Sequence, residues 1–325
     1  MLFVGKVLQV GGKYALKHPS TSLAVRLSSG VADASHRPCR ITARVPYSTS
    51  WSLSLDHPVI LPAEETAELP GTRAQKLLSA LQSRGDQVVE VELGSYDDIP
   101  SHGFDKIPMP LWKYLEWLQE TPEGTIGGKP LYLAQWVGRE QVDAIGAKVP
   151  PLLQPLLDSS SIDMYMEATF LGPTGAVTPF HYDAYMNFFH LQAASDHAKF
   201  AKHVILVPPF ASDMLRHAQR GSSVFSNTSK MKARLCREWS VSSGMQFHVE
   251  VHPEVPLNTA EALARHGMTC ILREGETLFI PKGWWHRVEN VCLAKEPQPL
   301  AGWTAGVSWW FLPRSGSHTR SRSAS

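Results

Sequence analysis

Two histidines and one aspartate have the types and spacing of a metal site. His181 and Asp183 stand two positions apart within residues 177–183, and His286 lies far downstream. Side chains two apart on an extended strand point to the same face, because their direction alternates with a period of two. A histidine from a distant strand can then complete three neighbouring corners of an octahedron. Two histidines and one carboxylate, with the other positions open, form the ligand set of non-haem Fe(II) oxygenases.

The surrounding sequence favours this interpretation over a simpler one. A histidine and an aspartate at this spacing are common, and either can be a surface or capping residue. Residues 172–175, Gly-Pro-Thr-Gly, however, predict a turn before a strand, and His286 follows an apolar segment that ends in Pro-Lys-Gly. We therefore predict that His181, Asp183 and His286 bind a metal ion.

Further segments near these residues form a recognisable series. They are residues 131–135, 170–183, 187–189, 202–209, 226–229, 274–286 and 307–310. The series resembles the JmjC family of iron- and 2-oxoglutarate-dependent oxygenases, and residues 274–286 are the strongest match. The resemblance covers roughly residues 85 to 313.

The resemblance implies a fold and a set of cofactors. The expected fold is mainly β (α+β), with a double-stranded β-helix of the cupin or jelly-roll type as its core and flanking N-terminal helices. The many short strands with Gly and Pro turns between residue 164 and residue 311 agree with such a barrel. The expected metal is Fe(II), with 2-oxoglutarate and O2 as cosubstrates. No catalytic residue beyond the metal ligands is assigned.

The cosubstrate requires further residues inside the barrel. A keto acid that binds the metal through one end leaves a distal carboxylate, which needs a cation and a hydroxyl as partners. We assign these roles to Lys202 and Thr178. By resemblance, Asn187, Tyr132 and Trp310 complete the pocket, although each of these three is equally consistent with a purely structural role.

Two of these assignments depend on local geometry. Thr178 lies three residues before His181, so it shares the ligand face only if Pro179 bends or bulges the strand. Lys199 is a rival to Lys202, because residues 191–201 are longer than the family's usual hairpin and contain no glycine. We prefer Lys202, whose distance from the Pro-Pro pair at 208–209 matches the family pattern.

The expected function is hydroxylation of a protein side chain, so the expected partner is a protein substrate. The alternatives are demethylation of a methyl-lysine, hydroxylation of a small molecule or a tRNA base, and a cupin-like binding protein without turnover. Hydroxylation is preferred because the chain has no Cys/His zinc module or chromatin-reading segment of the kind found in larger demethylases. An intact ligand set argues against the binding protein.

Composition narrows the classes of partner. The chain has 325 residues, 43% of them hydrophobic, enough to fill the core of one large domain. Its 31 basic and 30 acidic residues give a formal net charge of +1, so no overall field favours nucleic acid or an anionic membrane. No apolar run of about 18 residues predicts a membrane span. Nothing in the sequence fixes the oligomeric state.

The four cysteines and the histidines outside the predicted metal site form no recognisable motif. The cysteines are Cys39, Cys236, Cys270 and Cys292, which form no C-x-x-C pair and so predict neither a zinc ribbon nor a redox motif. As free thiols they favour an intracellular compartment. The histidines outside the motif, expected to be surface or core residues, include His190, His197, His203, His248 and His252.

Apolar periodicity predicts the elements around the barrel. Residues 73–83, 110–120 and 259–266 have helical spacing, and residues 88–93 and 164–170 read as strands. The domain boundaries we predict are 1–40 for a transit peptide or flexible N-terminus, 41–130 for an α/β flanking region, 131–313 for the catalytic double-stranded β-helix, and 314–325 for a disordered Ser/Arg-rich tail.

The N-terminal segment bears on localisation. It contains Lys6, Lys13, Lys17 and Arg26 and no acidic residue before Asp33, which is typical of a mitochondrial transit peptide. The alternative is a strand pair around Gly11 and Gly12. The expected location is intracellular: mitochondrial if the segment is a transit peptide, and otherwise cytoplasmic or nuclear.

Overall fold

The computed structural model of the protein describes most of the chain between Arg37 and Arg314. The described residues are 37–49, 56–63, 71–93, 105–120, 125–126, 129–147, 149–151, 153–157, 160–211, 215, 227–229, 231, 233–240, 244–295 and 301–314. Of the segment 1–40, predicted as a transit peptide or flexible N-terminus, residues 1–36 lie outside these residues, as do residues 315–325 of the predicted tail 314–325. Among the described helices, none is long and apolar enough to cross a membrane.

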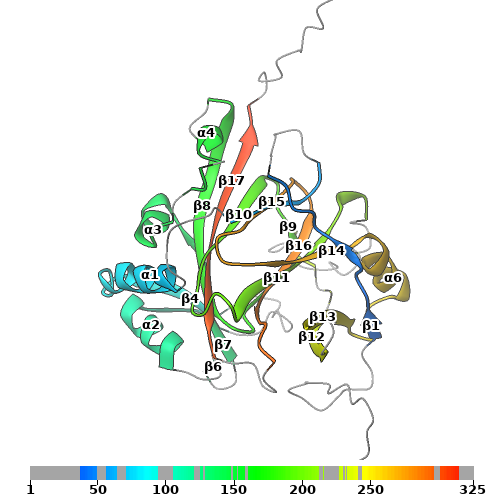
Figure 1. Cartoon of the computed structure of the whole chain (residues 1–325), viewed down its shortest axis with the longest axis horizontal. Coiled ribbons are helices and arrows are strands. Elements are labelled where there is room, and N and C mark those ends of the chain that lie inside the picture. Colours follow the sequence, from blue (N-terminus) through cyan, green and yellow to red (C-terminus); the bar gives the residue numbers. More distant parts are fainter. Residues whose placement is uncertain are drawn as a thin grey trace, which may run out of the picture.

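Two large sheets face each other at the centre of the molecule (Figure 1). The first runs in the order β3 (Val59–Leu61), β15 (Thr277–Ile280), β10 (Met186–Ala194), β17 (Trp303–Pro313), β8 (Ile162–Pro173), β7 (Lys129–Val137), β4 (Val88–Leu93) and β5 (Asp105–Pro110), with β6 (Thr125–Ile126) beside β7. The second runs in the order β2 (Ala43–Arg44), β14 (Met268–Leu272), β11 (Phe200–Val207), β16 (Trp285–Cys292) and β9 (Val177–Tyr182).

The chain alternates between the two sheets as it builds the barrel. It passes from β8 to β9, then to β10 and β11, and later from β14 to β15, β16 and β17. Two sets of four strands thereby form the two walls of a double-stranded β-helix. One wall is β15, β10, β17 and β8, and the other is β14, β11, β16 and β9. The mainly β fold predicted from the sequence is confirmed.

Alternation along the strands creates an apolar layer between the walls. This interior cluster includes Phe189 and Leu191 of β10, Val204 and Leu206 of β11, and Trp310 of β17. The side chains between them point the other way: Phe188 of β10, for example, belongs to the cluster on the outer face of the first sheet. The central strands β10 and β11 are therefore buried on both faces, which explains their largely apolar sequences.

Helices cover the outer face of the first sheet. They are α1 (Thr72–Gln82), α2 (Leu111–Glu120), α3 (Arg139–Ala144) and α4 (Gln154–Leu157). Leu77 and Leu81 of α1 and Leu115 of α2 are buried against this sheet, as their helical spacing predicts. The sequence placed the first two helices within one residue of their observed ends, and β4 at its observed bounds.

A smaller third layer covers the outer face of the second sheet. It consists of the three-stranded sheet β1 (Arg37–Cys39), β13 (Gly244–Val251) and β12 (Ala233–Ser240), together with α6 (Leu257–His266). Figure 1 shows this layer on the side of the barrel opposite α1 and α2. β1 pairs with β13, so residues 37–39 of the segment predicted as 1–40 form a strand.

Candidate metal centre

A β-bulge positions the first ligand pair. β9 pairs with β16 so that His181 lies opposite His286 but Thr178 lies opposite Val288. Three steps along β9 thus correspond to two along β16, and the extra residue falls at Pro179 or Phe180. The bulge expected at Pro179 is present. It brings Thr178 back to the interior face, where Val288 also lies, whereas Phe180 packs on the outer face.

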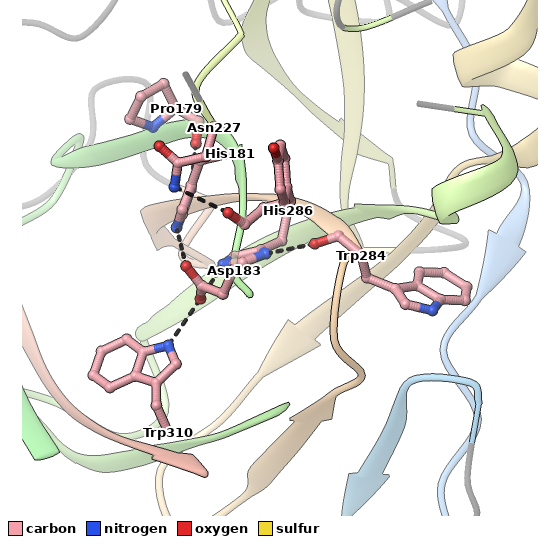
Figure 2. A network of polar contacts seen from close by, with 8 residues as sticks. Pro179, His181, Asp183, Asn227, Trp284, His286 and Trp310 are labelled. Atoms are coloured by element: carbon pink, nitrogen blue, oxygen red, sulfur yellow. Dashed lines mark hydrogen bonds and ion pairs between the residues drawn. The ribbon is translucent and has the colours of Figure 1, made fainter. Parts of the chain in front are cut away.

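The three candidate ligands converge inside the barrel. Their potential ligand atoms all lie within 4.8 Å of one another. His181 Nε2 is 3.9 Å from Asp183 Oδ1, and His286 Nε2 is 3.6 Å from Asp183 Oδ2. Figure 2 shows both imidazoles and the carboxylate turned toward one point. His286 is 3% exposed, so the site lies at the end of a buried strand rather than on the surface.

Backbone carbonyls orient both imidazoles. His181 Nδ1 lies 2.9 Å from the Pro179 oxygen, and His286 Nδ1 lies 3.0 Å from the Trp284 oxygen (Figure 2). A carbonyl only accepts, so each Nδ1 carries the proton and donates it. Each Nε2 then presents a lone pair toward Asp183. This is the arrangement by which a second hydrogen bond usually fixes a metal-binding histidine.

Electrostatics keep His286 and Asp183 in the protonation states that can bind a metal ion. Burial lowers the pKa of His286 to about 4, and the neighbouring His181 acts in the same direction, so His286 is neutral near pH 7. Burial acts to raise the pKa of Asp183, but the two histidines and a hydrogen bond from Trp310 outweigh it and leave the pKa lowered. A neutral imidazole beside an ionised carboxylate is the state that binds a divalent cation.

Trp310 donates a hydrogen bond to the carboxylate of Asp183. Its indole Nε1 donates to Asp183 Oδ2 at 2.8 Å. Trp310 lies on β17 in register with Asn187 of β10, so both side chains belong to the interior layer. The structure therefore places Trp310 beside a ligand of the predicted metal. Whether it also contacts the cosubstrate stays a prediction.

Lys202 is the centre of a second polar group in the same interior. It is fully buried on β11, and its Nζ donates to Asn290 Oδ1 at 2.6 Å. Within the described part of the chain, no carboxylate pairs with this ammonium. Burial accordingly lowers the pKa of Lys202 to about 7. Lys202 lies two residues before Val204 and four before Leu206 on β11, so its side chain points to the same interior face. Leu206 lies opposite His286.

Tyr132 and Thr178 face the same interior. Tyr132 is 4% exposed, and burial raises the pKa of its phenol although a hydrogen bond with Thr178 opposes the shift. Gly172 makes room for this ring, because a Cβ at position 172 would lie 2.5 Å from one ring carbon and 2.8 Å from another. The two residues predicted from different parts of the sequence thus meet in space.

Asn187 has an unsatisfied amide oxygen among the described residues. It is 3% exposed, and its Oδ1 has no hydrogen-bond partner among the described residues. Its strand neighbours Ile280 and Trp310 both belong to the interior cluster, so the amide faces the barrel interior. A buried amide oxygen without a partner is unfavourable by about 1–3 kcal/mol, which favours a bound group that donates a hydrogen bond to it.

Lys199 lies outside the barrel. Its Nζ is 2.9 Å from Asp196 Oδ2, and its side chain is 49% exposed. Lys199 lies in the turn between β10 and β11. This connection is not a hairpin, because β10 belongs to the first sheet and β11 to the second. The structure thus separates the two rival lysines by burial.

Two further residues beside this centre had no role assigned from the sequence. Asn290 links Lys202 to the end of β8, because its Nδ2 donates to the carbonyls of Gly172 and Pro173 at 2.9 and 3.0 Å. Asn227 flanks the ligand strand and donates to the Tyr182 carbonyl at 3.0 Å. The signal for Asn290 was its spacing, four residues after His286 on the same strand face.

The donor set fits a divalent first-row metal such as Fe(II). Two imidazole nitrogens and a carboxylate leave one side of the ion open. Metal–ligand bonds of about 2.0–2.2 Å place neighbouring donors roughly 3 Å apart. The measured separations of 3.6 and 3.9 Å reach that value with small side-chain rotations. The buried ammonium of Lys202 fits an anionic cosubstrate.

A family profile described as a cupin-like domain matches residues 140–317, more than half of the chain. The chain belongs to the cupin-like domain family. The match includes the candidate ligands His181, Asp183 and His286, whereas Tyr132 lies before it. The predicted resemblance to JmjC proteins is confirmed by a distant relative, "Lysine-specific demethylase JMJ30" of Arabidopsis thaliana. The two sequences are 29% identical over 142 residues, which are 44% of this cupin-like protein and 25% of the relative.

Proposed function

We propose that this cupin-like protein is an Fe(II)- and 2-oxoglutarate-dependent oxygenase that hydroxylates a protein side chain. The observation that carries the proposal is the convergence of His181 Nε2, His286 Nε2 and the Asp183 carboxylate within 4.8 Å. Both imidazoles are held in the tautomer that leaves Nε2 free. Bound Fe(II) would supply activation of dioxygen and oxidation of a substrate C–H bond.

The other interior residues would bind the cosubstrate. Lys202 would pair with the distal carboxylate of 2-oxoglutarate, and Thr178 and Tyr132 would offer hydroxyls beside it. A buried ammonium without a negative partner is costly, whereas the same ammonium paired with a bound carboxylate is compensated. Asn290 would orient the ammonium, because its Oδ1 accepts from Lys202 while its Nδ2 donates to carbonyls at the end of β8.

A protein substrate is supported by exposed aromatic surface next to the ligands. Tyr185 follows Asp183 by two residues and stacks on Tyr165, with ring centroids 3.8 Å apart and planes inclined by 10°. Tyr165 is 59% exposed. Aromatic side chains exposed beside a reactive centre offer contact area to an incoming polypeptide.

Demethylation of a methyl-lysine is the second candidate. It is favoured by the name of the distant relative, a lysine-specific demethylase, and it needs the same ligands and the same cosubstrate. The two reactions differ in the product. Oxidation at a side-chain carbon leaves a stable hydroxyl, whereas oxidation of an N-methyl group ends in loss of the methyl.

Peptide mass spectrometry after incubation with Fe(II), ascorbate and 2-oxoglutarate tests the proposal. A gain of one oxygen on a candidate protein supports hydroxylation, and loss of a methyl group supports demethylation instead. Uncoupled conversion of 2-oxoglutarate to succinate, measured without substrate, tests the oxygenase chemistry by itself. The control is His252→Ala, which removes a histidine outside the barrel. Folded protein that neither binds nor consumes 2-oxoglutarate would indicate a binding protein without turnover.

A further inference from the structure

The outer face of the β12–β13 hairpin carries a second group of metal-ligating side chains. This hairpin lies outside the barrel, in the layer that covers the second sheet (Figure 1). One of its faces packs inward, through Ala233, Val249 and Val251. Because side chains alternate, Cys236, His248 and neighbours two positions away lie together on the opposite face.

Strand register brings the three donors together. Cys236 lies directly opposite His248 in the antiparallel ladder, and Glu250 lies two residues further along β13. Their potential ligand atoms all lie within 4.8 Å of one another. His248 Nε2 is 3.5 Å from Glu250 Oε1, and the thiol of Cys236 is hydrogen-bonded to the same carboxylate.

Arg234 orients the carboxylate from the other side. Its Nε and Nη2 both donate to Glu250 Oε2, at 2.9 and 2.7 Å. This pairing keeps Glu250 ionised and leaves Oε1 directed toward His248. The side chains of His248 and Glu250 are 26% and 15% exposed, so an ion can reach them from solvent while most of their surface stays covered.

We propose that Cys236, His248 and Glu250 form a second metal site, which binds one zinc-class divalent cation. A thiolate, an imidazole and a carboxylate are the donor types of zinc sites, and the remaining position would hold water. On binding, the thiol releases its proton to solvent and the sulfur takes its place as a ligand of the cation. The proposal is independent of the function of the barrel site.

Such a site would tie the two strands of the hairpin together. The ligands come from both β12 and β13, and β13 also pairs with β1. A cation shared by both strands would therefore stabilise the layer that covers the second sheet. This arrangement could not be predicted from the sequence, since Cys236 and His248 lie twelve positions apart and match no short ligand motif.

Cobalt(II) titration of the full chain separates this site from the barrel site. A cysteine thiolate bound to Co(II) gives an intense near-ultraviolet charge-transfer band, which the His181, Asp183 and His286 set cannot give because it contains no sulfur. We expect the band in the wild type and in Asp183→Ala. We expect its loss in Cys236→Ser, a nearly isosteric change that leaves the hairpin fold intact.

Matched histidine variants complete the test. His248→Ala should weaken Co(II) binding at least tenfold, whereas His252→Ala, just beyond the end of β13, should leave it unchanged. Bound zinc, measured after desalting, should be one equivalent in Asp183→Ala and none in the double variant with Cys236→Ser. No charge-transfer band in the folded wild type, or an equal band in Cys236→Ser, would overturn the proposal. In either case the cluster is a hydrogen-bonded network only.

Discussion

Replacing Lys202 with methionine tests the cosubstrate site most sharply, because it removes a buried charge while keeping a side chain of similar length. Lys202 is fully buried and its only described polar partner is the neutral Asn290. If Lys202 anchors the distal carboxylate of 2-oxoglutarate, its loss leaves that carboxylate unpaired inside the barrel. Breaking a buried pair costs about 3–5 kcal/mol. The expected loss of 2-oxoglutarate affinity is therefore roughly a hundredfold to a few thousandfold.

The same substitution should stabilise the protein without cosubstrate. Burial lowers the pKa of Lys202 from 10.5 to about 7, which at about 1.4 kcal/mol per pH unit is an unfavourable contribution of up to about 5 kcal/mol. Because the folded-state pKa is lowered, the cost is present in full below about pH 7 and disappears as the pH rises toward 10.5. Lys202→Met should therefore raise the melting temperature more at about pH 6 than at about pH 10.

Calorimetry and equilibrium titration measure both effects, with Lys199→Met as the matched control. Lys199 is half exposed and paired with Asp196, so its replacement should change affinity and stability by no more than about 0.5 kcal/mol. In the wild type, 2-oxoglutarate affinity should also weaken above pH 7, because Lys202 must then take up a proton to bind. Normal affinity in Lys202→Met, or a larger loss in Lys199→Met, would refute the assignment.

Three further outcomes are expected. Asp183→Ala and His286→Ala should each abolish Fe(II)-dependent consumption of 2-oxoglutarate, and wild-type turnover in both would show that the ligands are misassigned. Trp310→Phe removes the 2.8 Å bond to Asp183 and should weaken metal binding by about 10–100-fold; unchanged affinity by metal titration would count against this role. Gly172→Ala crowds the Tyr132 ring and should raise the Kd for 2-oxoglutarate more than that for the metal, whereas equal effects would indicate general misfolding.

The convergence of the three candidate ligands could be predicted because its signal is local. His181 and Asp183 lie two apart at the end of one strand, and His286 follows a strong apolar and turn pattern. Even Thr178 could be placed, since proline within a strand predicts a bulge, and the register of β9 against β16 contains one. Periodicity likewise predicted α1, α2 and β4, because each has one buried face.

Residues that act through strand register could not be predicted. Asn290 is one of four polar residues in β16. Its spacing from His286 predicts the same strand face, but its importance follows only from its position opposite Lys202 on β11. Cys236 and His248 are likewise neighbours only because β12 and β13 pair in one particular register. Without an alignment of strands, the sequence offers no way to tell such pairs from isolated polar residues.

Anaerobic titration with Fe(II) and 2-oxoglutarate tests the central claim most directly. A keto acid that chelates Fe(II) produces a visible metal-to-ligand charge-transfer band, which neither component gives alone. We predict this band in the wild type and in His252→Ala, and its absence in Asp183→Ala and with a dicarboxylate that lacks the keto group. Folded wild-type protein that gives no band at saturating concentrations, or an undiminished band in Asp183→Ala, would contradict the assignment of the iron and 2-oxoglutarate site.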